Sequence, residues 1–174
     1  LVMNLQDFYD INVLGSIMIK GTTLEPRYGN PLPLLRKGQV ECLMQLDSKI
    51  PVLMRSCLMR LEELRKCYND KVIANIGGSC VDDYVETAKR ISTHDMVGAL
   101  ELNISCPNVH AGGIQFGTHP DMAAAVTKAV KAVSQKPVYV KLSPNVTDIV
   151  AMAKAVEAAG ADGITMINTM IGMR

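Results

Sequence analysis

Short apolar runs rich in isoleucine and valine alternate along this chain with longer amphipathic segments. The runs, which have the length and composition of β-strands, span residues 16–20, 71–76, 99–104, 137–142 and 163–168. The amphipathic segments, which have the period of α-helices, span residues 58–68, 82–91, 118–135 and 146–159. Strands that alternate with helices pair in parallel, because each helix returns the chain to the same end of the sheet. The alternation therefore predicts an α/β fold with a parallel sheet.

Two of the predicted helices have recognisable ends. Thr118 precedes Pro120 and Asp121, which predicts an N-cap, an early proline and an acidic residue in the first turn. The segment 146–159 stops before Gly160, a residue suited to the left-handed conformation that closes a helix. We expect these ends to fix where the helices join the neighbouring strands.

The length and charge of the chain limit the classes of protein to which it can belong. The 174 residues suffice for one domain with a sizeable core. The formal net charge is +1 and the acidic and basic residues are interleaved, which argues against a nucleic-acid-binding surface or a polybasic membrane patch. No apolar run approaches the roughly 20 residues of a membrane span, and the first residues lack a signal-peptide pattern. We expect a cytoplasmic protein that binds a small molecule or another protein.

The five cysteines are odd in number and widely spaced, which favours reduced thiols over a disulfide framework. The chain has no C-x-x-C pair, and its three histidines lie far from any cysteine pair with ligand spacing. We therefore expect no metal site.

Each predicted strand carries a polar residue at its carboxyl end. These residues are Lys20, Asn75, Asn103, Lys141 and Asn168. The carboxyl ends of parallel strands emerge on one face, where ligands and catalytic groups collect. One such residue is more often a turn residue than a ligand contact, but a polar residue at all five ends favours a shared site. Three amides and two cations suit a flat, anionic, hydrogen-bonding ligand, such as a flavin together with a heterocyclic carboxylate.

Other reaction classes find little support in the sequence. No Ser/His/Asp set for acyl transfer is evident, and "NIGGS" at residues 75–79 departs from the G-x-G-x-x-G pattern of dinucleotide binding. Cys106, three residues after Asn103, begins a glycine-containing loop. A thiol with a pKa of about 8.5 could act as a base near two lysines if that pKa were lowered. A buried structural thiol explains the spacing equally well.

Four motifs together carry a resemblance to a known family. They are "KGTT" at 20–23, "NISCPN" at 103–108, "VKLSPN" at 140–145 and "AGADGITMINT" at 159–169. In combination they resemble the catalytic subunit of the class 1 dihydroorotate dehydrogenases, over nearly all of the chain. The segment "GGIQFGTHPDM" at 112–122 is similar to the NAD-linked class 1B type.

The resemblance implies a (β/α)8 TIM barrel, of which this chain would hold about five to six βα units as a single partial FMN-binding domain, residues 1–174. It implies oxidation of dihydroorotate to orotate in pyrimidine biosynthesis. Cys106 matches the base that removes the C5 proton while hydride passes from C6 to flavin N5. The positions matching substrate contacts are Lys20, Asn103, Asn168 and Thr169. Those matching flavin contacts are Lys20, Gly21, Asn75, Asn103, Lys141 and Ile167, with Lys141 placed to stabilise negative charge on the flavin.

The resemblance also implies partners. Class 1B enzymes are similar heteromers in which a subunit carrying FAD and an iron-sulfur cluster passes electrons to NAD. This chain has no cluster-binding cysteines, so that subunit would be a separate chain. Homodimerisation of the catalytic subunit is likewise expected. Two related readings stay open: a catalytically inactive fragment, and a different flavin barrel of the dihydropyrimidine dehydrogenase or dihydrouridine type.

Two stretches depart from the family pattern. Residues 1–6 and 35–59 lack it, and "VECLMQLDSKIPVLMRS" stands at 40–56, where the family has an asparagine-bearing substrate loop. Residues 43–56 can be encoded by codons that translate, when read in a shifted frame, to N-A-I-G-L-Q-N-P-G-V-D-A-V. The synonymous third bases of these codons were chosen to give this result. We therefore predict that both stretches are out of frame. The chain also stops at Arg174, short of the roughly 250 residues of a complete barrel, which predicts exposed strand edges and association.

Overall fold

The computed structural model describes residues 8–24, 35–37, 42–44, 52–105 and 113–170. A parallel sheet of six strands dominates this part of the chain, in the order β4-β1-β5-β6-β7-β8. Its strands are β1 (Ile17–Thr23), β4 (Val52–Leu53), β5 (Val72–Ile76), β6 (Val97–Asn103), β7 (Val138–Lys141) and β8 (Gly163–Thr165). A separate antiparallel pair joins β2 (Leu35–Lys37) to β3 (Cys42–Met44). The predicted parallel α/β fold is confirmed.

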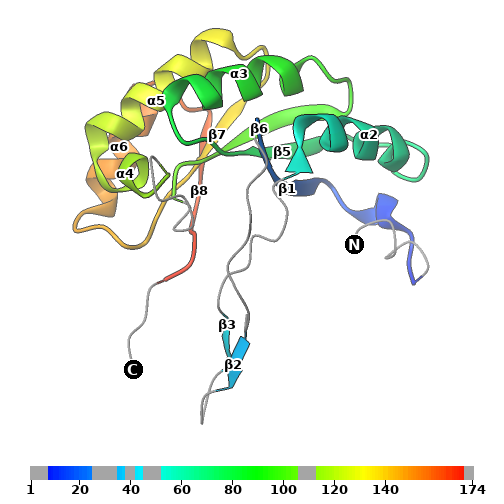
Figure 1. Ribbon diagram of the computed structural model, residues 1–174, viewed down its shortest axis with the longest axis horizontal. Helices are drawn as coiled ribbons and strands as arrows, with labels where there is room; N and C mark the ends of the chain where they lie inside the picture. Colours follow the sequence, from blue (N-terminus) through cyan, green and yellow to red (C-terminus); the bar gives the residue numbers. More distant parts are fainter. Residues whose placement is uncertain (1–7, 25–34, 38–41, 45–51, 106–112, 171–174) are drawn as a thin grey trace.

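Helices connect the strands and lie on one face of the sheet (Figure 1). They are α2 (Met54–Leu64), α3 (Val81–Ser92), α4 (Gly113–Thr118), α5 (Pro120–Val133) and α6 (Ile149–Ala158), and a short 3-10 helix, η1 (Ile11–Val13), precedes β1. From β1 onward, β5, β6, β7 and β8 follow one another in chain order across the sheet. Parallel strands in chain order, with their helices outside, form the wall of a (β/α)8 barrel. None of the helices within the described ranges is long and apolar enough to cross a bilayer.

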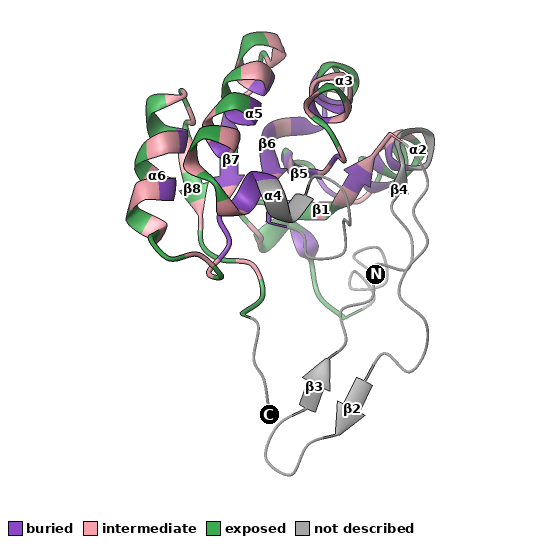
Figure 2. Cartoon of the chain, turned by 60° about the vertical axis from the view of Figure 1, so that its left-hand side comes forward, coloured by how far each residue is buried: buried purple, intermediate pink, exposed green. Residues whose placement is uncertain are grey.

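The hydrophobic core lies between the sheet and this helical layer (Figure 2). Leu100 and Leu102 of β6 and Val140 of β7 are fully buried there, in one cluster with Val126 of α5 and Met152 of α6. Each such side chain contributes about 1.5–3 kcal/mol through its removal from water. Because side chains alternate along a strand, Glu101 and Asn103 of β6 point to the opposite face.

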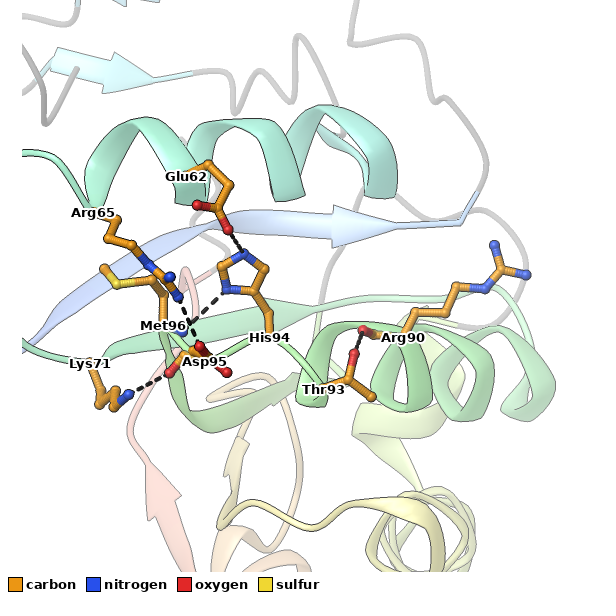
Figure 3. A network of polar contacts seen from close by, with 8 residues as sticks. All are labelled: Glu62, Arg65, Lys71, Arg90, Thr93, His94, Asp95 and Met96. Atoms are coloured by element: carbon orange, nitrogen blue, oxygen red, sulfur yellow. Dashed lines mark hydrogen bonds and ion pairs between the residues drawn. The ribbon is translucent and has the colours of Figure 1, made fainter.

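A polar network joins helix α2 to the amino-terminal ends of β5 and β6 (Figure 3). His94 Nδ1 accepts a hydrogen bond from the backbone N–H of Met96 at 3.2 Å, which leaves Nε2 to donate to Glu62 at 3.0 Å. Lys71 Nζ donates to the carbonyl of Asp95 at 2.6 Å, and Arg65 pairs with the Asp95 carboxylate at 3.2 Å. The amino-terminal end of a βα sheet serves stability, so we assign His94 a structural role.

Several element ends differ from the sequence prediction. The N-cap of α5 is His119 rather than Thr118, because residues 113–118 form the additional helix α4. This helix comes close to β6: a Cβ on Gly117 would lie 2.5 Å from the carbonyl oxygen of Ile104. Helix α2 starts at Met54, four residues earlier than expected, directly after the unpredicted strand β4. Gly160 closes α6 with a φ of 96°, as predicted.

Candidate functional site

A bulge in β1 shapes one side of the carboxyl edge of the sheet. The pairing of β1 with β5 jumps from Ile19 opposite Ala74 to Thr22 opposite Ile76. Lys20 and Gly21 therefore both oppose the single residue Asn75. A Cβ on Gly21 would lie only 2.9 Å from Asn75 Oδ1, so glycine leaves the space that this amide occupies.

Three asparagines at this edge form a chain of hydrogen bonds, which we call the asparagine relay (Asn75, Asn103 and Asn168). Asn168 Nδ2 donates to Asn103 Oδ1 at 3.3 Å, and Asn103 Nδ2 donates to Asn75 Oδ1 at 3.4 Å. Asn75 Nδ2 then donates to Glu101 Oε1 at 2.5 Å. The relay thus joins β5, β6 and the segment after β8, although its residues are far apart in sequence.

Asn168 is fixed by further contacts to the neighbouring chain ends. Its Nδ2 donates to the carbonyl of Ser105 at 3.1 Å and to Ser105 Oγ at 2.9 Å. Its backbone N–H donates to the carbonyl of Leu142 at 3.0 Å, and its Oδ1 accepts from the backbone N–H of Thr169 at 2.8 Å. The predicted substrate contacts Asn168 and Thr169 are therefore held against the ends of β6 and β7.

Helix α3 contacts the end of β6, the strand that carries Asn103 of the relay. The hydroxyl of Tyr84, whose ring is fully buried, donates to the backbone carbonyl of Asn103 at 2.9 Å. The Tyr84 ring meets Phe116 of α4 edge to face, with centroids 5.8 Å apart. These contacts fix the end of β6 where Asn103 leaves the strand.

Two lysines flank the amides along the sheet edge. Lys141 of β7 lies opposite Asn103 in the strand register and is half-buried. Lys20, in the β1 bulge, is exposed. Across β1, β5, β6 and β7 the order of side chains is therefore cation, amide, amide, cation. The prediction that Lys20 ends its strand is wrong, because β1 continues through the bulge to Thr23.

Of the remaining predicted site residues, one lies next to the relay and one lies outside the described residues. Ile167 follows β8 and is 40% exposed, beside Asn168. Cys106, the predicted base, lies outside the described residues. Sequence reasoning missed Glu101, a fully buried acid between Leu100 and Leu102. The available signal was a charged residue inside an otherwise apolar strand.

The side chains at this edge suit the binding of a planar anion. Amides donate and accept hydrogen bonds, while lysines add positive charge that can balance a carboxylate or an electron-rich ring. In the part of the chain that the structure describes, no three His, Cys, Asp or Glu side chains gather as metal ligands would. The described side chains of this edge supply hydrogen bonds and positive charge to a ligand.

Comparison with known proteins agrees with this geometry. The family model described as dihydroorotate dehydrogenase matches residues 2–174. The chain belongs to the dihydroorotate dehydrogenase family. The sheet of β1, β5, β6, β7 and β8 with its outer helices is accordingly part of a TIM barrel, as the resemblance implied.

Three relatives within the dihydroorotate dehydrogenase family carry the name "Dihydroorotate dehydrogenase B (NAD(+)), catalytic subunit". The protein from Bacillus pumilus is 59% identical over 166 residues, which cover 95% of this chain and 53% of the relative. That from Bacillus cytotoxicus is 57% identical over 170 residues, covering 96% and 54%. That from Anoxybacillus flavithermus is 58% identical over 167 residues, covering 96% and 53%. The chain thus spans about half the length of these relatives.

Proposed function

We propose that this chain supplies the substrate- and flavin-binding edge of a dihydroorotate dehydrogenase, which oxidises dihydroorotate to orotate in pyrimidine biosynthesis. The observation that carries the proposal is the asparagine relay, flanked by Lys20 and Lys141 at the carboxyl edge of the sheet. Orotate is a planar anion with a carboxylate, two ring carbonyls and ring N–H groups. Linked amides match its polar rim, and lysines balance its charge.

FMN fits the same edge. The proposed flavin contacts are Lys20, Gly21, Asn75, Asn103, Lys141 and Ile167. Gly21 offers backbone without a side chain beside the Asn75 amide, and Lys141 adds positive charge next to Asn103. When bound, FMN supplies the acceptor for the hydride that leaves the substrate.

The residues of this chain have separate proposed roles. Asn103, Asn168 and Thr169 hold the substrate in the plane needed for the reaction, and Lys20 binds its negative charge. Cys106 takes the C5 proton as a thiolate, a role that the motif "NISCPN" supports. Lys141 stabilises negative charge that develops on the flavin side.

The names of the relatives, which are catalytic subunits of an NAD(+)-linked enzyme, support a separate partner subunit, and the finer features of the proposed assembly rest on the resemblance of the sequence motifs. We propose a separate electron-transfer subunit that carries FAD and an iron-sulfur cluster, a homodimer of the catalytic subunit, and a cytoplasmic location. Co-purification of the chain with that subunit from a common expression host would test the heteromer.

The proposed domain is residues 1–174, one partial FMN-binding domain with residues 1–6 and 35–59 out of frame. Most of these two stretches lies outside the described residues. Independent reads of the source DNA test the reading frame: an uninterrupted coding of both stretches in the present frame would contradict it.

Orotate binding tests the proposed site without requiring turnover. Asn103→Ala removes the central amide of the relay, and we expect the Kd for orotate to rise by about tenfold, as the loss of a charge-assisted hydrogen bond would produce. Asn69→Ala, at an exposed residue before β5, is the matched control and should leave the Kd unchanged. Equal affinities of the Asn103→Ala variant and the original chain would contradict the site.

A further inference from the structure

Glu101 is the only charged side chain that is fully buried in the described part of the chain. It lies on the face of β6 that carries Asn103, opposite the face on which Leu100 and Leu102 pack against the helices. Its Oε1 accepts the hydrogen bond from Asn75, while its Oε2 is buried and has no hydrogen-bond partner within the described residues. The roles proposed above for the site leave this carboxylate unused.

A carboxylate at the end of the relay fixes the direction of every hydrogen bond in it. An ionised carboxylate only accepts, whereas an amide donates through nitrogen and accepts through oxygen. Asn75 must therefore turn its Nδ2 toward Glu101 and its Oδ1 toward Asn103. Asn103 in turn points its Nδ2 at Asn75 and its Oδ1 at Asn168. Flipping any one amide would bring two oxygens or two N–H groups together.

This direction determines what Asn103 offers to a ligand. Its Oδ1 accepts from both Asn168 Nδ2 and Ser105 Oγ, so both acceptor positions are used. One of the two hydrogens on its Nδ2 points to Asn75, and the other has no acceptor among the described residues. The group left at Asn103 is a donor, which matches a carboxylate or carbonyl oxygen.

We propose that Glu101 is a positioning residue whose buried carboxylate sets the direction of the asparagine relay, so that Asn103 presents an N–H donor to the acidic substrate. The nature of the ligand rests on the proposed function, whereas the direction of the relay is a property of the unliganded chain. Glu101 acts through Asn75 and has no contact with the substrate in this account.

Replacing Glu101 by glutamine tests the proposal, because the side chain keeps its shape while its end can donate as well as accept. In the isotopically labelled, unliganded chain, the side-chain N–H signals of Asn75 and Asn103 should shift and exchange faster with solvent in Glu101→Gln. The Kd for orotate should rise about tenfold. Glu157→Gln, at an exposed position of α6, is the control and should change neither quantity.

A second variant distinguishes an effect of Glu101 on the direction of the hydrogen bonds from an effect on packing. In the double variant Glu101→Gln/Asn75→Asp, the carboxylate introduced at position 75 can accept from both the new amide and Asn103 Nδ2. The Asn103 signals should therefore return toward those of the original chain, which a merely structural role of Glu101 would not produce.

Two results would overturn the proposal: Asn103 signals that stay unchanged in a folded Glu101→Gln chain, or no recovery in the double variant. If the original chain fails to bind orotate, the proposed function is contradicted, while the signals of the unliganded chain still decide the role of Glu101.

Discussion

Asn75 has a glycine on one side and a buried carboxylate on the other, and both are needed for the position of its amide. Gly21 leaves room for Oδ1, and Glu101 accepts from Nδ2. Neither neighbour is adjacent to Asn75 in sequence. The site at the residue scale is therefore a product of strand pairing between β1, β5 and β6.

Replacing Gly21 by alanine would test the space beside this amide. A Cβ at 2.9 Å from Asn75 Oδ1 is too close, so the amide must move, and we expect a loss of about 1–3 kcal/mol in the free energy of unfolding. Gly15→Ala is the matched control, because a Cβ there meets nothing within 4 Å. Urea unfolding measures both variants; equal stabilities would contradict the close packing at Gly21.

The burial of the Cys57 thiol predicts a slow reaction with alkylating reagents. Burial raises the pKa of Cys57, although the hydroxyl of Thr22, which donates to Sγ at 3.3 Å, opposes the shift. Since the thiolate is the reactive form, Cys57 should be alkylated by iodoacetamide more slowly than the exposed Cys80 in the native chain. Mass spectrometry of the labelled peptides measures both rates, and a faster Cys57 would contradict the burial.

Residue positions at the strand ends could be predicted from the sequence, but their hydrogen bonds could not. The polar residue that closes an apolar run located Asn75 and Asn103 at the ends of β5 and β6, whereas β8 ends at Thr165, three residues before Asn168. Which amide donates to which depends on register and on the acid at position 101, and a one-residue shift would change every pairing. Sequence patterns carry no such information.

At the scale of elements, Asp162 links α5, β7 and the start of β8. Its Oδ2 accepts from Lys131 Nζ and from the backbone N–H of Val138, each at 2.6 Å. The Lys131 hydrogen bond, followed by the Val138 hydrogen bond, lowers the pKa of Asp162 below its ordinary value. These contacts stabilise the folded chain only while the carboxylate is ionised.

Asp162→Asn should therefore lower stability in a pH-dependent way. A carboxylate with a lowered folded pKa contributes stability above its unfolded pKa of about 3.9 and loses it as the pH falls through the folded value. We expect the variant to be less stable by about 1 kcal/mol at pH 7, since water screens this half-exposed pair. Urea unfolding at several pH values should show the difference disappearing in acid. A difference that stays constant down to low pH would contradict this.

Regular elements could be predicted because their periodicity reflects which face is buried, as in α6, where Met152 and Val156 face the core. Element ends were less predictable. Helix α4 forms in a glycine-containing segment because Gly117 can approach the carbonyl of Ile104, a tertiary contact. Strand β4 forms because Val52 and Leu53 pair with Thr22 and Thr23, which no local pattern indicates.

At the scale of the whole molecule, the sheet face away from the helices exposes apolar side chains. Met18 of β1 is 43% exposed and Tyr139 of β7 36%, whereas Ile164 of β8 pairs with Val140 and so lies on the helical face. These strands pair in parallel, and β4 and β8 end the sheet without a further strand in the described residues. An apolar face with open edges favours association between chains.

Sedimentation velocity over a range of concentrations measures this association. We expect the chain to form dimers or larger species as its concentration rises, and Met18→Lys to shift the distribution toward monomer by placing a charge on the exposed face. Val150→Lys, at an exposed residue on the helical side, is the control and should have little effect. A monomer at every concentration would contradict this account of the exposed face.

Anaerobic addition of dihydroorotate to the chain loaded with FMN tests the proposed activity most directly. We predict that the visible absorbance of the bound flavin falls, that Cys106→Ala abolishes the change, and that Cys106→Ser retains it at higher pH, where a hydroxyl base is more effective. Flavin that is bound by the original chain but stays oxidised after dihydroorotate is added would contradict the proposed function.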